Sequence, residues 1–236
     1  PHIGTDVLRN VIVKMRKDMI RFGCTFLFHT KLKKIYGEED TIRGIEVVST
    51  TGTNPYLDKF GDTTIFCDSL VLAIGHSASD TYELLYDAGI ELSEKPFAVG
   101  VRVQHRQSEI DLAQYGDYRK YAGEANYTLP AANYKLAGKT SSGRAVYSFC
   151  MCPGGYVINS STEHEGLLVN GMSNAKRDSG YANSAIVAAV EPKGDVFKGL
   201  RYQRDLESAM YRLADGKIPV QRYADFKKCD GTHDEN

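Results

Sequence analysis

The sequence predicts a protein of mixed α and β structure, α+β over its whole length, with an α/β region followed by a mainly antiparallel β region. Three observations support this fold class: an amphipathic helix pattern at the start, short extended segments separated by polar turns, and one continuous apolar run. That run, Leu70–Ile74, ends at Gly75 and is typical of a strand buried on both faces, as in a parallel sheet.

The first expected element is a helix from Thr5 to Phe22. Thr5 or Asp6 can cap its start, and Gly23 suits a left-handed stop. The short bulky run Thr25–His29 follows, and we expect a buried strand there. The apolar residues of the helix fall on one face: Leu8, Val11, Ile12, Met15, Met19 and Ile20.

A three-stranded meander is expected next. Its strands are Lys31–Tyr36, Thr41–Thr50 and Thr63–Cys67. Polar turns at residues 37–40 and 59–62 and a surface loop at residues 51–58 separate them.

A helix start is expected directly after Gly75. Asp80 can cap the first turn, and Glu83 completes a capping box. A strand that runs through a glycine into a helix suits a bound phosphate, although a purely structural turn explains the same spacing equally well.

The later part of the chain predicts alternating short helices and strands. Tyrosines between Tyr118 and Leu136 are expected to line a wall, and the tail after Asp225 is expected to be polar. The expected helices are Asp80–Ala88, Ser108–Tyr115 and Leu200–Ala214. The inward residues of the last helix are expected to be Leu200, Leu206, Met210 and Leu213. The expected strands are Pro96–His105, Ala185–Val190 and an antiparallel set of Arg144–Cys152, Tyr156–Ser161 and Leu167–Ser173.

Composition excludes several classes of partner. The 236 residues carry a net charge of −1, which gives no electrostatic case for nucleic acid or an anionic membrane. No apolar run approaches the roughly 20 residues that cross a bilayer, and no signal peptide is visible. The five cysteines are odd in number and scattered, which favours reduced thiols in a cytoplasm.

Several segments resemble the bacterial FAD-dependent dehydrogenases of unassigned substrate, a group of two-dinucleotide-type flavoproteins. In such flavoproteins the second flavin-contacting strand ends in an alanine-threonine-glycine-like triplet, which is Ala73-Ile74-Gly75 here. The other similar segments are Pro1–Asp6, Gly75–Tyr82, Lys95–Arg102, Cys150–Gly155, Asn170–Ser173, Arg177-Asp178, Ala182–Ser184 and Leu200–Arg204.

The resemblance implies a domain organisation. Residues 1–78 would be the downstream half of an FAD/NAD(P)-binding Rossmann-like domain, with the Leu70 strand beside the strand at Phe26. Residues 79–224 would be an inserted substrate domain, and residues 225–236 a tail. The chain has no Gly-x-Gly-x-x-Gly segment and begins at Pro1, so under this resemblance it is a fragment that starts after the phosphate loop.

The resemblance also implies two groups of site residues. The cofactor-binding group is Ala73, Gly75, His76 and Ser77. The group that would border the substrate cleft is Arg102, Cys150, Cys152, Gly154, Gly155, Arg177 and Asn183. Either arginine could hold a carboxylate or phosphate by paired hydrogen bonds, and Gly154 and Gly155 would let the backbone approach a flat ring.

The two cysteines at the end of the Arg144 strand are expected to point to one face, since they lie two residues apart. A zinc site is disfavoured because no second ligand pair completes it, and a disulfide is disfavoured by geometry. His105 is a candidate proton donor, but no triad or nucleophile elbow accompanies it.

The function expected from the resemblance is that of an FAD-dependent oxidoreductase. The parent protein would transfer hydride between a small substrate and the flavin, with NADH or NADPH as a candidate electron donor, and the chain by itself would be inactive. The alternative is a non-catalytic domain that binds a small anionic ligand or a partner protein.

Overall fold

The computed structural model describes residues 2–39, 41–51, 54–58, 63–117 and 129–229. It shows an α+β protein of helices and antiparallel sheets. The chain divides into two compact units, Asp6–Ser93 and Pro1–Thr5 together with Glu94–Asn236. Within the described ranges, no helix combines the length and the apolar character that crossing a bilayer requires.

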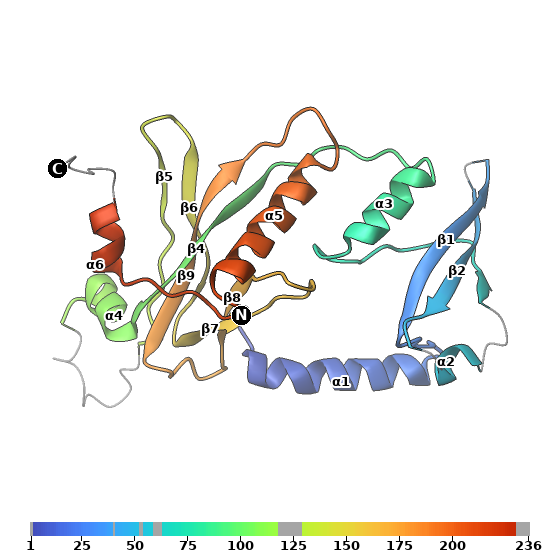
Figure 1. Ribbon diagram of the computed structural model, residues 1–236. Coiled ribbons are helices and arrows are strands. Elements are labelled where there is room, and N and C mark those ends of the chain that lie inside the picture. Colours follow the sequence, from blue (N-terminus) through green and yellow to red (C-terminus); the bar gives the residue numbers. More distant parts are fainter. Residues whose placement is uncertain (1, 40, 52–53, 59–62, 118–128, 230–236) are drawn as a thin grey trace. The chain divides into compact units, whose positions relative to one another are not determined.

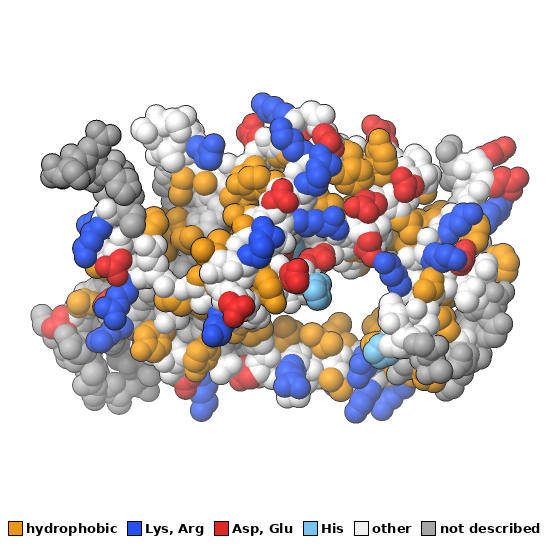
Figure 2. Space-filling model, viewed as in Figure 1, with side chains coloured by type: hydrophobic (Ala, Val, Ile, Leu, Met, Phe, Trp, Pro, Cys, Tyr) orange, Lys and Arg blue, Asp and Glu red, His pale blue; other side chains and the backbone are white. Residues whose placement is uncertain are grey.

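Helix α1, Thr5–Arg21, confirms the first expected element. Gly23 ends it with a φ of 92°, and its amide hydrogen bonds to the carbonyl of Ile20. None of the helix residues is buried, and Ile12 and Met15 are each more than half exposed. Figure 2 shows hydrophobic side chains at the surface along α1. The expected apolar face therefore exists, but none of its side chains is buried within the described residues.

The three-stranded meander is confirmed. Strands β1, Thr30–Glu38, β2, Thr41–Ser49, and β3, Thr64–Phe66, form an antiparallel sheet in the order β1-β2-β3 (Figure 1). The connection from β2 to β3 contains the short helix α2, Pro55–Asp58. Asn54, only 3% exposed, anchors this connection by donating from Nδ2 to the His29 carbonyl at 2.8 Å. The turn expected at residues 59–62 lies outside the described residues.

Two strand predictions in this unit are wrong. Residues 70–74 form no strand, and Val71 is 87% exposed. Residues 25–29 also form no strand, so the two segments do not pair as expected. A strand that is apolar on both faces needs neighbouring strands on its edges and cover on its faces. The described residues of this unit supply neither neighbouring strands nor cover for residues 70–74, because the only sheet that they form is the meander β1-β2-β3.

Helix α3, Ser79–Asp87, confirms the expected helix, which Gly89 follows with a φ of 78°. The predicted capping box is wrong: Ala78 occupies the cap position, without a side-chain hydrogen bond. Asp80 instead forms an ion pair with Lys31 of β1 at 2.5 Å, which ties α3 to the meander. That lysine lowers the pKa of the Asp80 carboxyl, chiefly through the hydrogen bond.

The second unit is built on a four-stranded antiparallel sheet in the order β4-β9-β6-β5 (Figure 1). The long central pair runs from Phe97↔Val190 to Arg106↔Tyr181. The strands are β4, Phe97–Arg106; β5, Ala137–Lys139; β6, Ala145–Cys152; and β9, Tyr181–Val190.

A separate two-stranded sheet joins β7, Gly155–Asn159, and β8, Val169–Ser173. The expected antiparallel set is therefore only partly correct, since β6 pairs with β5 and β9 and not with β7. The pairing of β6 with β9 is irregular at Cys150, whose φ is 48°, and ends at Cys152. The chain then turns at Pro153, which lacks an amide hydrogen, and at Gly154, whose φ is 53°. After this turn, β7 pairs with β8 in a separate sheet.

Helices flank the larger sheet. Helix α5, Lys198–Leu213, contacts it through Tyr202, whose ring lies 6.1 Å from that of Phe97. Two of its expected inward residues are wrong: Leu206 and Leu213 are exposed, while Glu207 is buried. The remaining elements are α4, Gln107–Tyr115; α6, Tyr223–Phe226; and the short 3-10 helix Lys227–Cys229. Helix α4 has Arg106 at its cap position and no side-chain cap from Ser108.

The interior of this unit is unusually polar. Ala182, Asn183 and Ser184 on β9 are all 0% exposed, and Ser173 and Gln107 are also buried. A buried polar group destabilises a fold unless it is hydrogen-bonded. These buried polar groups therefore indicate where in the unit a functional site could lie.

Candidate functional site

A pair of polar side chains on neighbouring strands forms the centre of the candidate site. Arg102 of β4 donates from Nε to Oδ1 of Asn183 on β9 at 2.8 Å. Its Nη2 donates to the carbonyl oxygen of Cys150 at 2.7 Å and lies 3.5 Å from Sγ of Cys152. We call Arg102, Asn183, Cys150, Cys152 and Gly171 the polar cluster.

Gly171 of β8 lies directly over this pair. A methyl group added there would come within 2.0 Å of Nη2 of Arg102 and 2.2 Å of Oδ1 of Asn183. Only glycine leaves room for the guanidinium. Nδ2 of Asn183 is buried and has no hydrogen-bond partner in the described part of the chain, so the cluster retains one unused donor.

A β-bulge separates the two cysteines. The pairing of β6 with β9 is irregular between Phe149 and Cys152, and Cys150 has a left-handed backbone. The two thiols differ in exposure, since Cys150 is exposed and Cys152 is buried. The bulge turns the Cys150 carbonyl toward Arg102. No group of metal-binding side chains is found among the described residues.

Partial desolvation raises the pKa of the Cys150 thiol above its ordinary value, although the residue as a whole is exposed; Cys152 adds to the rise and Arg102 opposes it. The thiolate is the nucleophile, so we expect iodoacetamide to label Cys150 slowly near pH 7, with the rate rising through a midpoint above the usual value of about 8.5. Mass spectrometry of labelled peptides between pH 6 and 10 measures this rate. A labelling midpoint below the usual value would contradict it and indicate an activated thiol.

The glycines after β6 accommodate the chain itself. A methyl group on Gly154 would lie 1.7 Å from the carbonyl oxygen of Arg177, and one on Gly155 would lie 2.2 Å from that of Met172. The Gly154 amide donates to Oε1 of Gln107 at 2.8 Å. In the described structure, backbone of the chain itself fills the space beside these two glycines.

Arg177 is held in an unusual backbone conformation. Its φ is 55°, in the left-handed region that few residues other than glycine adopt, and its amide hydrogen bonds to the Asn174 carbonyl. Nε of Arg177 is buried without a partner among the described atoms. A hollow of about 590 Å³ adjoins it, lined by His2, Pro130, Ala131, Ala175, Lys176 and Arg177.

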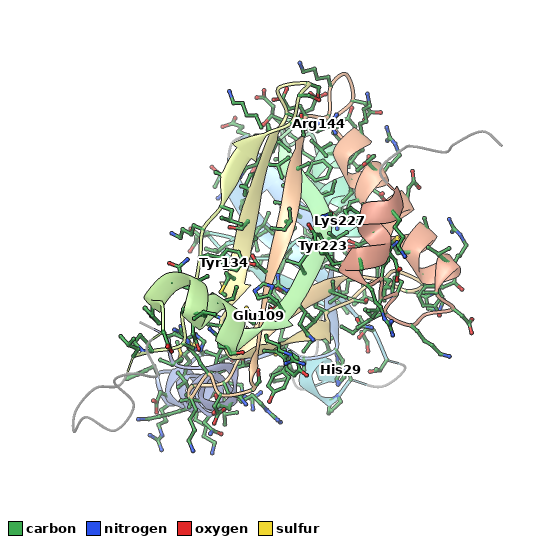
Figure 3. The ribbon with its side chains drawn as sticks, turned by 90° about the vertical axis from the view of Figure 1, so that its left-hand side faces the viewer. His29, Glu109, Tyr134, Arg144, Tyr223 and Lys227 are labelled. Atoms are coloured by element: carbon green, nitrogen blue, oxygen red, sulfur yellow. The ribbon has the colours of Figure 1, made fainter. Side chains whose placement is uncertain are left out.

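A second pair lies where β4 meets α4. The rings of His105 and Tyr134 are 5.5 Å apart, and Figure 3 shows Tyr134 and Glu109 toward the same end of the sheet. Burial lowers the pKa of His105, against the opposing effect of Glu109, and burial raises the pKa of Tyr134. Both groups are therefore neutral at pH 7, and the buried Nε2 of His105 has no partner among the described atoms.

The predicted cofactor residues lie in the other unit, in the extended segment before α3. Ala73, Gly75 and His76 are exposed, and Oγ of Ser77 lies 3.1 Å from Nε2 of His76. Gly75 has a φ of 72° and no atom within 4 Å of an added methyl position. The backbone here is open to close approach, as a flavin contact would require.

The structure thus brings together the residues predicted to border a substrate cleft. Arg102, Asn183 and the cysteines share hydrogen bonds, and Gly154 joins them to Arg177 through backbone contact. Sequence reasoning missed Gly171 and Gln107. No sequence signal identifies Gln107, whose amide also donates to the carbonyl of Ala132, whereas Gly171 stood in a segment that carried the resemblance.

Comparison with known proteins identifies the class. Residues 96–236 match the family model of the FAD-dependent protein, C-terminal domain-like family. The chain therefore belongs to this family. It is also 39% identical over 234 residues to an uncharacterized protein of Clostridium beijerinckii (strain ATCC 51743 / NCIMB 8052), a match that covers 96% of this chain and 40% of that protein. The chain thus spans about two fifths of the length of the curated relative.

Proposed function

We propose that the chain is part of an FAD-dependent oxidoreductase whose second unit carries the substrate side of the active site. The family match over residues 96–236 carries this proposal. The polar cluster supports it, because a half-buried arginine hydrogen-bonded to a buried asparagine that keeps one unused donor fits a site that orients a polar substrate. The reaction would be hydride transfer between a small substrate and flavin.

The residues that would contact FAD in this proposal are Ala73, Gly75, His76 and Ser77. The open space at Gly75 fits this role, since a ligand could meet the backbone there. The bound flavin would supply the hydride-accepting chemistry, while the protein would supply binding and orientation. The side chains of His76 and Ser77 already contact each other and would offer polar atoms to the cofactor.

Two exposed apolar surfaces in the first unit support the proposal that this chain is a fragment of a longer flavoprotein. One is the face of α1, and the other is the segment around Val71. The relative is about two and a half times as long as the stretch that it shares with this chain. In the parent protein we propose that an upstream segment covers both surfaces and pairs with residues 70–74 in the Rossmann-like arrangement.

Within the second unit, we assign Arg102 a positioning role. Its Nε and Nη2 already donate to Asn183 and to the Cys150 carbonyl, so it fixes the bulge and the amide in place. Arg177, whose Nε lacks a partner among the described atoms, is the better candidate to meet an anionic substrate group. NADH or NADPH is the proposed electron donor, and a reducing cytoplasm the proposed compartment.

We expect the chain by itself to bind FAD weakly or not at all, because it contains no Gly-x-Gly-x-x-Gly segment to hold the pyrophosphate. Mixing the chain with FAD and passing it over a desalting column tests this expectation. The protein fraction should be colourless, and a version extended upstream to the length of the relative should retain the yellow flavin. Stoichiometric flavin on the shorter chain would contradict the fragment proposal.

The alternative is a non-catalytic domain that binds a small anionic ligand. The hollow lined by His2, Lys176 and Arg177 favours it, because it gathers basic side chains. The upstream sequence separates the two proposals: a strand, a Gly-x-Gly-x-x-Gly segment and a helix support the oxidoreductase.

A further inference from the structure

The hollow beside residues 174–177 collects positive charge that the described residues do not neutralise. Lys176 and Arg177 line it from one side, and His2 lines it from the start of the chain. Within the described ranges neither basic side chain of this turn has a carboxylate within ion-pair distance; Asp178, next in sequence, forms no such pair either. Adjacent unpaired cations repel each other, and an anion relieves that repulsion.

The backbone holds these side chains in a fixed arrangement. The Arg177 amide closes a turn onto the Asn174 carbonyl at 3.1 Å, and Nε2 of His2 lies 3.4 Å from the same carbonyl. On the other side, the Arg177 carbonyl packs against Gly154, and Gly154 is fixed by Gln107. The left-handed conformation of Arg177 is therefore imposed from both sides, as is common where a side chain must point at a ligand.

The guanidinium also has an unused buried donor. Nε of Arg177 is inaccessible to solvent and makes no hydrogen bond to any described atom. Because Nε is closed to solvent, a planar anion with two oxygens in the hollow would accept from the two terminal nitrogens of the guanidinium, a bidentate geometry that carboxylates and phosphates favour. Lys176 would add a point charge at the rim, where its exposed ammonium can swing toward the ligand.

We infer that this hollow binds a small molecule through its carboxylate or phosphate group, with Arg177 as the main anchor and Lys176 and His2 at the rim. The inference deepens the proposed function, because Arg177 belongs to the predicted substrate cleft. Under this inference, the substrate of the proposed oxidoreductase is a compact anion.

Isothermal titration calorimetry of the chain at low ionic strength tests the inference with three probes: inorganic phosphate, pyrophosphate and succinate. We expect at least one to bind, and raising sodium chloride should weaken it. Phosphate or pyrophosphate alone would identify a phosphoryl ligand, and succinate alone a carboxylate ligand. Absence of binding by all three would overturn the inference.

A charge-removal pair localises the binding. Lys176→Gln with Arg177→Asn removes both charges, and asparagine tolerates the left-handed backbone at residue 177. We expect a loss of at least about tenfold in affinity. The matched control is Lys139→Gln with Arg144→Gln, which removes the same charge at the β5–β6 hairpin. Arg144 lies at the other end of the sheet from Tyr134, as Figure 3 shows. Equal loss in both variants would overturn the site.

Thermal unfolding of each variant verifies that the unit remains folded. Because no flavin enters these measurements, a failure here would leave FAD binding by the parent protein untouched. Conversely, anion binding by a parent protein that does not hold flavin would support this site and contradict the proposed oxidoreductase.

Discussion

Replacing Gly154 by alanine is expected to lower the free energy of unfolding of the second unit by about 3–5 kcal/mol. Two effects combine at this residue. Its φ of 53° strains any side chain, and the added methyl would lie 1.7 Å from the Arg177 carbonyl oxygen. Backbone cannot yield as the end of a flexible side chain can, so the turn at 174–177 must move. Thermal unfolding should show a midpoint lower by about 10 °C.

The control for this variant is Gly143→Ala. Gly143 also has a positive φ, of 84°, but an added methyl there meets no atom within 4 Å. It therefore carries the backbone strain alone, and we expect a cost of about 1 kcal/mol. If both variants lost the same stability, the close packing of Gly154 against Arg177 would be wrong.

Replacing Arg102 by methionine is expected to cost about 2–5 kcal/mol. The methionine keeps an unbranched chain but donates nothing, so Oδ1 of the buried Asn183 loses its donor, and the Cys150 carbonyl keeps only the weak hydrogen bond from Sγ of Cys152. Each buried acceptor left unsatisfied costs about 1–3 kcal/mol. Urea unfolding monitored by circular dichroism measures the change.

A second readout separates this role from simple packing. The charge of Arg102 holds down the pKa of the Cys150 thiol, so its removal should move the labelling midpoint to higher pH. Arg106→Met, four residues further along the same face of β4, should change stability by no more than about 0.5 kcal/mol and leave the midpoint unchanged. An Arg102→Met variant of normal stability would show that the polar cluster is not a structural unit.

The sequence predicted the elements that depend on local pattern. Helix α1, the meander, α3 and β4 all followed from periodicity and from stop glycines such as Gly23 and Gly89. The failures came where structure depends on distant partners. Residues 70–74 have the apolar pattern of a buried strand, but a strand forms only where neighbours accept its hydrogen bonds.

The candidate site shows the same division. The resemblance marked Arg102, Cys150 and Asn183, yet only the register of β4 with β9 and the bulge in β6 reveal that they share hydrogen bonds. The bulge was not predictable because it depends on the left-handed backbone of Cys150, a residue type with no preference for it. Gly154 was marked as a place of close approach, and the approaching group proved to be the chain itself.

We propose above that this chain is part of a flavin-dependent oxidoreductase. The absorbance spectrum of the full-length protein tests it most directly, first as purified and then after anaerobic addition of NADH or NADPH. We predict the absorbance bands of oxidised flavin, which bleach when the nicotinamide donor is added. A full-length protein that is colourless, and stays colourless after incubation with FAD and desalting, would contradict the account.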